Sequence, residues 1–265
     1  MASAAGSGPG VAGTAASVSG TAASASAAGP AASASASGTA SSAAGRGSSA
    51  PDLGRPTTFL LLRHGETALT GEKRFSGSGG SDPALSETGL VQAARAAEAL
   101  AVRGRVDAVI SSPLTRCRET AAAAASRLGL DVSVEEDLRE TAFGSWDGLT
   151  FAEVRARFPG QMDTWLASPA VAPPGGESFE DVSARVERCR DELLAAHRGR
   201  TVLLVSHVTP IKTFVRLALG APQETLFRMY LGPASLSEVA FYGDGNASLR
   251  CFNEEAHLRG DAQGV

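Results

Sequence analysis

The sequence predicts an α/β domain of three layers, in which a mostly parallel central sheet is covered by helices on both faces. Strands are predicted by short apolar, β-branched segments near residues 59–62, 106–110 and 202–206, which are typical of strands buried on both faces. Helices are predicted between and after them, near residues 86–104, 114–128, 150–158, 179–197 and 210–219. Strands that alternate with helices indicate right-handed crossovers and therefore parallel pairing.

Local signals set the ends of several of these elements. Ser86 can cap the first long helix, which should end at Gly104 because glycine is favoured just beyond a helix C-terminus. Pro113 suits the start of the next helix. Two β-rich segments near residues 235–242 and 248–252 are joined by a turn of Gly, Asp, Gly and Asn. This arrangement predicts an antiparallel hairpin at one edge of the sheet.

The chain divides by composition into a tail and one catalytic domain. Its first 50 residues are almost wholly Ala, Ser, Gly and Thr, with Arg46 as their single charge and no aromatic residue. Such a segment cannot bury a core, so residues 1–56 are predicted to be a disordered tail or linker. Residues 57–255 are predicted to form the folded domain and residues 256–265 a flexible C-terminus. The tail is too weakly apolar for a membrane span and resembles no secretory signal, so no membrane association is expected.

Charge and cysteine usage restrict the class of partner. Beyond the first 50 residues there are 23 basic and 28 acidic residues without a basic run, which argues against a nucleic-acid partner. The three cysteines, Cys117, Cys189 and Cys251, are widely spaced and odd in number, which suits a reducing cytoplasm. Cys117 lacks the Cys-x5-Arg phosphate loop of cysteine phosphatases and is expected to be a buried helix residue. No carboxylate cluster or His/Asp set suggests a metal, so neither metal nor cofactor is predicted.

The most informative motif is Arg63-His64-Gly65-Glu66-Thr67, which follows the apolar segment 59–62. Ligands of α/β proteins bind at the carboxyl ends of strands. A guanidinium matches phosphate oxygens through paired hydrogen bonds, and backbone N–H groups near Gly65 can add to such a site. His64 would then face the phosphorus, which a neutral imidazole can attack. The alternative is a solvated Arg63 and a hydrogen-bonded core histidine.

Two further strand ends carry related chemistry. Ser-Ser-Pro-Leu-Thr-Arg at residues 111–116 follows the second predicted strand, so Arg116 lies in the first turn of the next helix. The third predicted strand runs directly into Ser206 and His207. The chain has four histidines, and two of them occupy predicted strand ends, which favours a shared phosphate site over coincidence.

These three motifs, in this order, resemble the histidine phosphatase family, also called phosphoglycerate-mutase-like, over about residues 57–252. The resemblance implies that His64 becomes a phosphohistidine and that Arg63, Arg116 and His207 hold the transferred phosphoryl group. The segments 72–83 and 206–212 most closely resemble the phosphatase half of actinobacterial bifunctional proteins that join a ribonuclease H domain to an acid phosphatase domain. The sequence contains no such first domain, so ribonuclease activity is not expected.

The resemblance also implies a general acid, which matches Glu140 in the segment from Leu138 to Gly148. A phosphate ester leaves as an alkoxide unless a nearby group protonates it, and positioned proton transfer contributes about 10²–10⁴ in rate. The alternative is that Glu140 belongs to a solvated acidic stretch with residues 135–137.

Three weaker site candidates complete the predicted phosphate site. Thr70 stands where many members of the family have an asparagine, and its hydroxyl can still donate one hydrogen bond. Ser76 and the backbone of Gly77, in a Gly/Ser-rich loop, are candidates to meet the phosphate or the substrate, although such loops are ordinary connections.

Residues 151–176 are the predicted specificity region. They hold one predicted helix, Trp165 and a turn-rich end, and are expected to lie over the pocket. Trp146 and Trp165 are expected to pack in a core rather than to stack on substrate. Glu177 is interpreted as part of a helix entry, beside its capping Ser178.

The sequence as a whole predicts a metal-independent phosphomonoesterase, similar to acid phosphatases, that acts on small phosphorylated metabolites. Three alternatives stay open: phosphoglycerate-mutase-type phosphoryl transfer, an α-ribazole-phosphate phosphatase, and a non-catalytic sensor of a phosphorylated ligand. The physiological substrate and the oligomeric state are not predicted.

Overall fold

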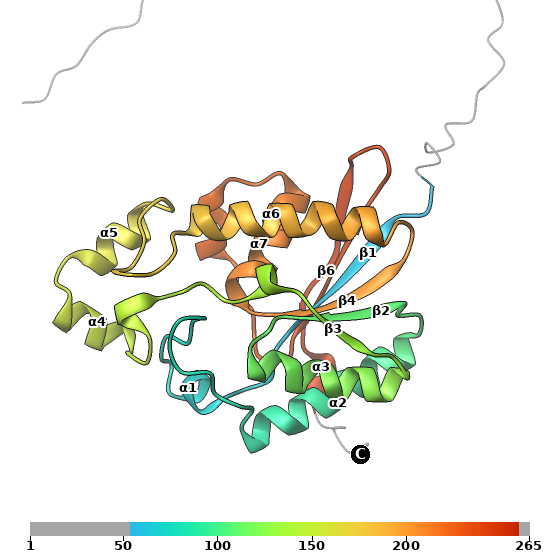
Figure 1. The fold of residues 1–265 in the computed structure, drawn as a ribbon, viewed down its shortest axis with the longest axis horizontal. Coiled ribbons are helices and arrows are strands. Elements are labelled where there is room, and N and C mark those ends of the chain that lie inside the picture. Colours follow the sequence, from blue (N-terminus) through green and yellow to red (C-terminus); the bar gives the residue numbers. More distant parts are fainter. Residues whose placement is uncertain (1–53, 260–265) are drawn as a thin grey trace, which may run out of the picture. The chain divides into compact units, whose positions relative to one another are not determined.

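The computed structural model describes residues 54–259, and the predicted tail of residues 1–56 lies almost wholly outside this range. A sheet of six strands forms the centre of the domain, in the order β3-β2-β4-β1-β5-β6 (Figure 1). The strands are β1 (Thr57–Arg63), β2 (Ala108–Ser111), β3 (Val132–Val134), β4 (Thr201–Ser206), β5 (Leu236–Phe241) and β6 (Ala247–Glu254).

The sheet is parallel except at one edge. β1, β2, β3 and β4 pair in parallel, with Leu61 beside Leu204 and Ile110 beside Leu204 on the other side. β5 pairs antiparallel with β1, and β6 pairs antiparallel with β5, which confirms the predicted terminal hairpin. Because β1, β2 and β4 are neighbours that run the same way, their carboxyl ends meet at one edge of the sheet.

Helices cover both faces of the sheet, as predicted. α2 (Glu87–Arg103) and α3 (Thr115–Leu128) lie on one face, and α6 (Phe179–Ala196) and α7 (Val208–Leu219) lie on the other (Figure 1). α4 (Phe151–Arg157) and α5 (Gln161–Ala167) extend beyond the carboxyl edge of the sheet, and α1 (Ala68–Gly71) is a single turn after β1.

The helix ends follow the predicted capping signals. The Ser86 side chain accepts a hydrogen bond from the N–H of Gly89, and Gly104 follows the last residue of α2. Ser178 and Asp181 form a reciprocal capping box at the start of α6. α3 begins at Thr115, two residues after Pro113, and ends before Gly129 in the left-handed conformation that glycine adopts readily.

The region 151–176 departs from the prediction of one helix, because it holds both α4 and α5. Gly160, at φ +77°, reverses the chain between them. α5 has no side-chain cap, and its stability comes from Met162 and Trp165, which are buried in an aromatic cluster. A helix held by tertiary contacts gives little signal in its own sequence. β3, α1 and four 3-10 turns were not predicted either, because each spans only a few residues.

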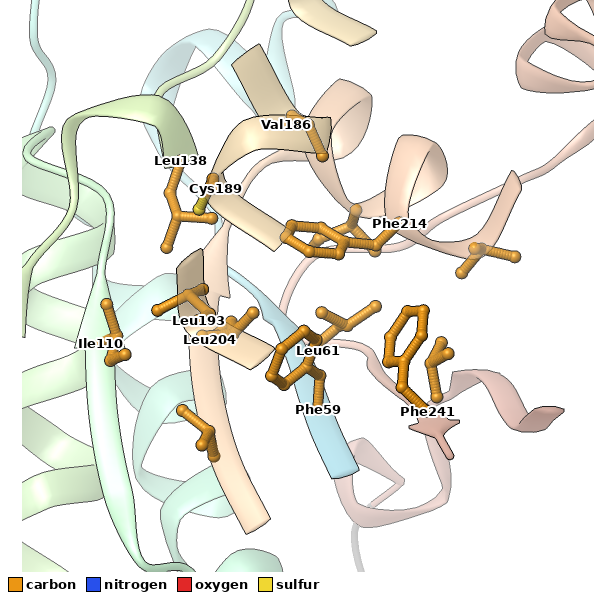
Figure 2. Close-up of a cluster of buried hydrophobic side chains, with 14 of the residues drawn as sticks. Phe59, Leu61, Ile110, Leu138, Val186, Cys189, Leu193, Leu204, Phe214 and Phe241 are labelled. Atoms are coloured by element: carbon orange, nitrogen blue, oxygen red, sulfur yellow. The ribbon is translucent and has the colours of Figure 1, made fainter. Parts of the chain in front are cut away.

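Beneath α6 and α7, the core contains interlocking aromatic and aliphatic side chains (Figure 2). Phe59 of β1 contacts Phe214 of α7 edge to face at 5.8 Å between ring centroids, and Phe241 of β5 at 5.4 Å. These contacts set the distance between α7 and β1. The N-terminus of α7 therefore stays at the carboxyl edge of the sheet.

The described chain ends in a 3-10 turn, η4 (Ala256–Leu258), whose Leu258 carbonyl accepts a hydrogen bond from Arg95 of α2 at 2.6 Å. This turn lies within the segment predicted to be flexible, and residues 260–265 lie outside the described range. Within residues 54–259, every helix is too short or too polar to cross a bilayer.

Replacing Phe214 by alanine should lower the free energy of unfolding by about 3–5 kcal/mol, because it removes a fully buried ring between α7 and the sheet. Leu219→Ala, on the same helix but 52% exposed, should change it by less than about 0.5 kcal/mol. Urea unfolding of both variants measures the difference. Equal losses would contradict the packing described here.

Candidate active site

The first element of the site is the pair Arg63 and His64, at the carboxyl end of β1. The N–H of His64 donates to the Ser206 carbonyl at 3.0 Å, and the His64 carbonyl accepts from the N–H of Ala234 at 3.0 Å. These bonds extend the pairing of β1 with its neighbours beyond the strand itself. The backbone of His64 is therefore fixed, and the next residue must be small, because a Cβ on Gly65 would lie 2.5 Å from the Gly89 carbonyl oxygen.

A single hydrogen bond assigns the proton on the His64 ring. Nδ1 lies 2.7 Å from the carbonyl oxygen of Gly65, which can only accept. Nδ1 therefore carries the hydrogen in the neutral ring, and the lone pair lies on Nε2. The side chain is 5% exposed and lines a cavity, so this lone pair is held in one orientation.

The surroundings of His64 favour the neutral ring. Burial lowers its pKa well below the usual range, and the positive charges of Arg63 and Arg116 lower the pKa further. The hydrogen bond to Gly65 opposes this shift. An uncharged imidazole ring in this position can act as a base or as a nucleophile.

Two arginines next to His64 have hydrogen-bond donors without acceptors. Arg63 donates Nη1 to the Leu231 carbonyl at 2.7 Å, and Arg116 donates Nη2 to the Ser76 carbonyl at 2.9 Å. Arg63 Nε, Arg116 Nε and Arg116 Nη1 are buried with no hydrogen-bond partner among the described residues, although Arg116 Nη1 lies 3.6 Å from Asp82 Oδ1 in a longer ion pair. Unpaired buried donors on charged groups are costly, and an oxyanion beside them would satisfy them.

His207 follows β4 and lies against His64. The two ring centroids are 5.1 Å apart, and His207 is completely buried. Its Nε2 lies 2.7 Å from the Ser112 hydroxyl and 3.3 Å from the Cys117 sulfur. Burial lowers the pKa of His207 well below the usual range, and the charge of Arg116 acts in the same direction. Cys117 is itself fully buried, as predicted, and burial raises the pKa of its thiol.

Glu140 lies on the wall of the same cavity and is 6% exposed. Its Oε1 accepts hydrogen bonds from the N–H of Thr141 at 2.8 Å and from the N–H of Thr209 at 3.3 Å. Thr209 lies in the first turn of α7, so the carboxylate sits at the positive end of that helix. The alternative of a solvated acidic stretch does not describe this buried carboxylate.

A buried ion pair holds the loop that carries Glu140. Arg185 of α6, 3% exposed, donates to the carbonyl oxygens of Asp137, Arg139 and Glu140. The same guanidinium pairs with Glu177 at 3.0 Å and 3.1 Å, and Glu177 also accepts from the N–H of Ala142. Two nitrogens of one rigid fork thus bind three carbonyl oxygens within residues 137–140, and Glu177 holds that fork in place, so Glu177 does more than enter a helix.

The three weaker candidates have different surroundings. Thr70 and Ser76 line the cavity, and Ser76 Oγ is buried without a partner among the described residues. Gly77 does not line it. Its N–H donates to Asp147 Oδ1 at 2.6 Å, and a Cβ there would lie 2.4 Å from the Thr141 carbonyl oxygen. The missing side chain at Gly77 thus lets its loop pack against the residues that follow Glu140 in the chain. The N–H of Gly77 is already hydrogen-bonded to Asp147.

The cavity has a volume of about 400 Å³. Arg116 and His207 are not among the lining residues but lie next to His64: the two histidine rings are 5.1 Å apart between centroids, and the charge of Arg116 acts on the pKa of His64. The residues that line it are Arg63, His64, Thr70, Lys73, Arg74, Phe75, Ser76, Glu140, Phe143, Phe151, Trp165, Leu166, Phe179, Val208, Thr209, Lys212, Leu226 and Phe227.

Sequence reasoning missed Thr209, Lys212 and Arg185. Lys212 lines the cavity one helical turn after Val208 and donates to the Leu226 carbonyl at 3.1 Å; burial lowers the pKa of its ammonium group. Arg185 interrupts the apolar stripe of α6 between Val182 and Val186. A charged residue at such a position is visible in the sequence and could have indicated a buried ion pair. Thr209 acts through its backbone, which leaves no mark in the sequence.

Within residues 54–259, no group of three or more His, Cys, Asp and Glu side chains has the arrangement of a metal site. The polar groups that converge on the cavity are cations, a neutral imidazole and one carboxylate. This set is suited to an anion of the size and charge of phosphate.

Comparison with known proteins agrees with this chemistry. The chain is 51% identical over 205 residues to a bifunctional protein of Mycobacterium tuberculosis, a match that covers 77% of this chain and 56% of that protein. The chain thus spans little more than half the length of this relative. It is 38% identical over 175 residues to a glucosyl-3-phosphoglycerate phosphatase of Mycolicibacterium vanbaalenii, covering 63% of this chain and 76% of that one.

A solved structure has the same fold. The mycobacterial glucosyl-3-phosphoglycerate phosphatase in complex with VO3 superimposes with a TM-score of 0.68 at 34% identity, covering 75% of this chain and 99% of that chain. The family model of the histidine phosphatase superfamily, branch 1, matches residues 59–254. The chain therefore belongs to the histidine phosphatase superfamily, branch 1, which confirms the predicted family.

Proposed function

We propose that this chain is a phosphomonoesterase that needs no metal ion and acts on small phosphorylated molecules through a phosphohistidine on His64. One observation carries the proposal. A neutral His64 with its Nε2 lone pair free lies beside three buried guanidinium nitrogens that have no acceptor among the described residues. A phosphate monoester supplies both the electrophile and the missing acceptors.

The first step transfers the phosphoryl group to the enzyme. His64 Nε2 forms a bond to phosphorus while the bond between phosphorus and the alcohol oxygen breaks. Arg63, Arg116 and His207 stabilise the equatorial oxygens, where charge is concentrated in the transition state. Glu140 gives a proton to the departing alcohol, and the hydrogen bonds from Thr141 and Thr209 hold its carboxyl group in place.

The second step returns the enzyme to its starting state. Glu140, now a carboxylate, takes a proton from water as the water oxygen attacks phosphorus. The bond between phosphorus and Nε2 breaks, phosphate leaves, and His64 is neutral again. The same carboxyl group thus serves both half-reactions, and Arg185 and Glu177 keep it in reach of both through the loop they hold.

Removal of the nucleophile is the first test. His64→Gln should lower phosphate release from simple phosphomonoesters by at least about 10⁴-fold, because no other histidine lines the cavity in the described structure. The wild-type rate should be the same with and without a chelator. His257→Gln, which changes a histidine outside the cavity, is the matched control. Rapid hydrolysis by His64→Gln would refute the covalent route, and flux to an isomeric phosphate ester without release would instead indicate a mutase.

A second test separates the acid role of Glu140 from its charge. Glu140→Gln should slow hydrolysis of an alkyl phosphate by about 10²–10⁴-fold, because the alcohol then leaves unprotonated. 4-Nitrophenyl phosphate has a leaving group that needs no proton, so its phosphoryl transfer to His64 should be affected far less. Single-turnover rates of alcohol release measure both. An equal loss for the two esters would contradict the assignment of Glu140 as the acid.

The pH profile tests the electrostatics of His64. Attack needs the neutral ring, and the lowered pKa of His64 means that activity persists as pH falls through about 6.5 and is lost only when the ring is protonated. Arg63→Gln removes one of the charges that lower this pKa, so the acid limb of its kcat/KM profile should move to higher pH.

The control is Arg118→Gln, which changes net charge equally at an exposed position of α3. Because both variants use the same substrate, the titration of the substrate phosphate cancels in the comparison. An acid limb that stays in place in Arg63→Gln would show that Arg63 does not act on His64.

A further inference from the structure

The cavity that holds His64 has an apolar, mostly aromatic side. Phe75, Phe143, Trp165 and Phe179 line it and are each less than a tenth exposed. Their rings contact one another, with centroid distances of 4.7 Å for Phe75 and Phe143 and 4.9 Å for Trp165 and Phe179. Rings locked in this way form a rigid apolar surface that does not need to reorganise when a ligand arrives.

Large apolar side chains at the same cavity remain exposed to solvent. Phe151 of α4 is 50% exposed, Leu166 of α5 is 38% exposed and Phe227 of the 3-10 helix η3 (Gln223–Arg228) is 40% exposed. Three separate segments each direct one such residue to one cavity, and Phe151 and Phe227 rest on the aromatic cluster with one part of each ring still open to solvent. Exposed apolar side chains that converge on a cavity are typical of a ligand site.

Several polar groups of this cavity are already engaged. The N–H of Thr209 donates to Glu140 and the backbone carbonyl of Ser76 accepts from Arg116, whereas the Ser76 hydroxyl has no partner among the described residues. Arg74 is occupied by Glu72, Glu153 and the Gly148 carbonyl. A sugar or polyol buried here would leave hydroxyl groups without partners, at a cost that an aromatic ring does not incur.

From this surface we infer the substrate class of the site: phosphomonoesters whose alcohol carries an aromatic ring or a similarly apolar body, which packs against Phe151, Leu166 and Phe227. The inference rests on the proposed function, because it assumes that the phosphate binds at Arg63 and His64. It sets this chain apart from a site built for a polyhydroxylated or amino acid ester.

Two esters with primary alkyl leaving groups test the preference without a difference in leaving-group chemistry. 2-Phenylethyl phosphate should have a kcat/KM at least about tenfold above that of glycerol 1-phosphate, mainly through a lower KM. In the double variant Phe151→Ala/Phe227→Ala the ratio of the two kcat/KM values should fall to about one, mainly through a higher KM for 2-phenylethyl phosphate. Both positions are half-exposed, so the fold should tolerate the change. Leu90→Ala, 55% exposed on α2 and outside the cavity, is the matched control.

A binding measurement separates this inference from the proposed function. Titration calorimetry with 3-phenylpropylphosphonate and 3,4-dihydroxybutylphosphonate reports affinity without turnover, and the phenyl compound should bind at least about tenfold more tightly. Hydrolysis of both esters at equal kcat/KM, with equal phosphonate affinities, would overturn the substrate class while leaving the phosphatase intact. Tight binding of the phenyl compound without phosphate release from either ester would overturn the phosphatase and support the apolar site.

Discussion

The site depends on one constraint, which is the parallel alignment of β1, β4 and β2. These neighbouring strands end at the same edge of the sheet, so the residues that follow them must share one small volume. Arg63 and His64 follow β1, His207 follows β4, and Arg116 lies in the helix after β2. Packing such as that of Phe59 against Phe214 keeps α7 in register with this edge. These four side chains are therefore positioned by the packed core rather than by flexible loops.

Burial and neighbouring charges then set the protonation states of the site and its affinity for an anion. Burial, reinforced by the charges of neighbouring arginines, lowers the pKa of both histidines and favours the neutral rings, and the Gly65 carbonyl selects the tautomer of His64. The same burial leaves guanidinium donors without acceptors, which prepares the site for an anion before one binds. The positive charges of Arg63 and Arg116 repel each other when no anion is bound. A phosphate dianion between them would attract both, so its binding relieves this repulsion. Stability and binding oppose each other here, as is common at functional sites.

The proposed proton donor, Glu140, is held by a separate set of contacts. Glu140 lies in a loop, outside any strand or helix. Its position is set by Arg185 of α6, by Glu177 just before that helix, and by the N-terminus of α7. One guanidinium fixes three carbonyl oxygens of the loop at once. The proposed nucleophile is therefore held by the sheet, and the proposed acid is held by the helices on one face of it.

Much of this could be predicted from the sequence, because each strand end carries its own local signature. The apolar segments, the caps at Ser86 and Ser178, and the placement of Arg63, His64, Arg116 and His207 after strands all depend on residues close in sequence. α5, Arg185 and Lys212 escaped prediction because their surroundings come from distant segments. Gly77 shows the reverse case: its backbone N–H was a reasonable phosphate donor until Asp147, a residue far along the chain, was found to bind it.

The most direct test of the account is to trap the covalent intermediate. Glu140→Gln enzyme would be mixed with 4-nitrophenyl phosphate, quenched in alkaline denaturant and digested, and the phosphorylated peptide identified by mass spectrometry. We predict about one phosphate per chain, located on His64, because phosphoryl transfer to the ring precedes the step that needs the carboxylate. Phosphate on another residue, or 4-nitrophenol release with no phosphorylated peptide, would contradict the account.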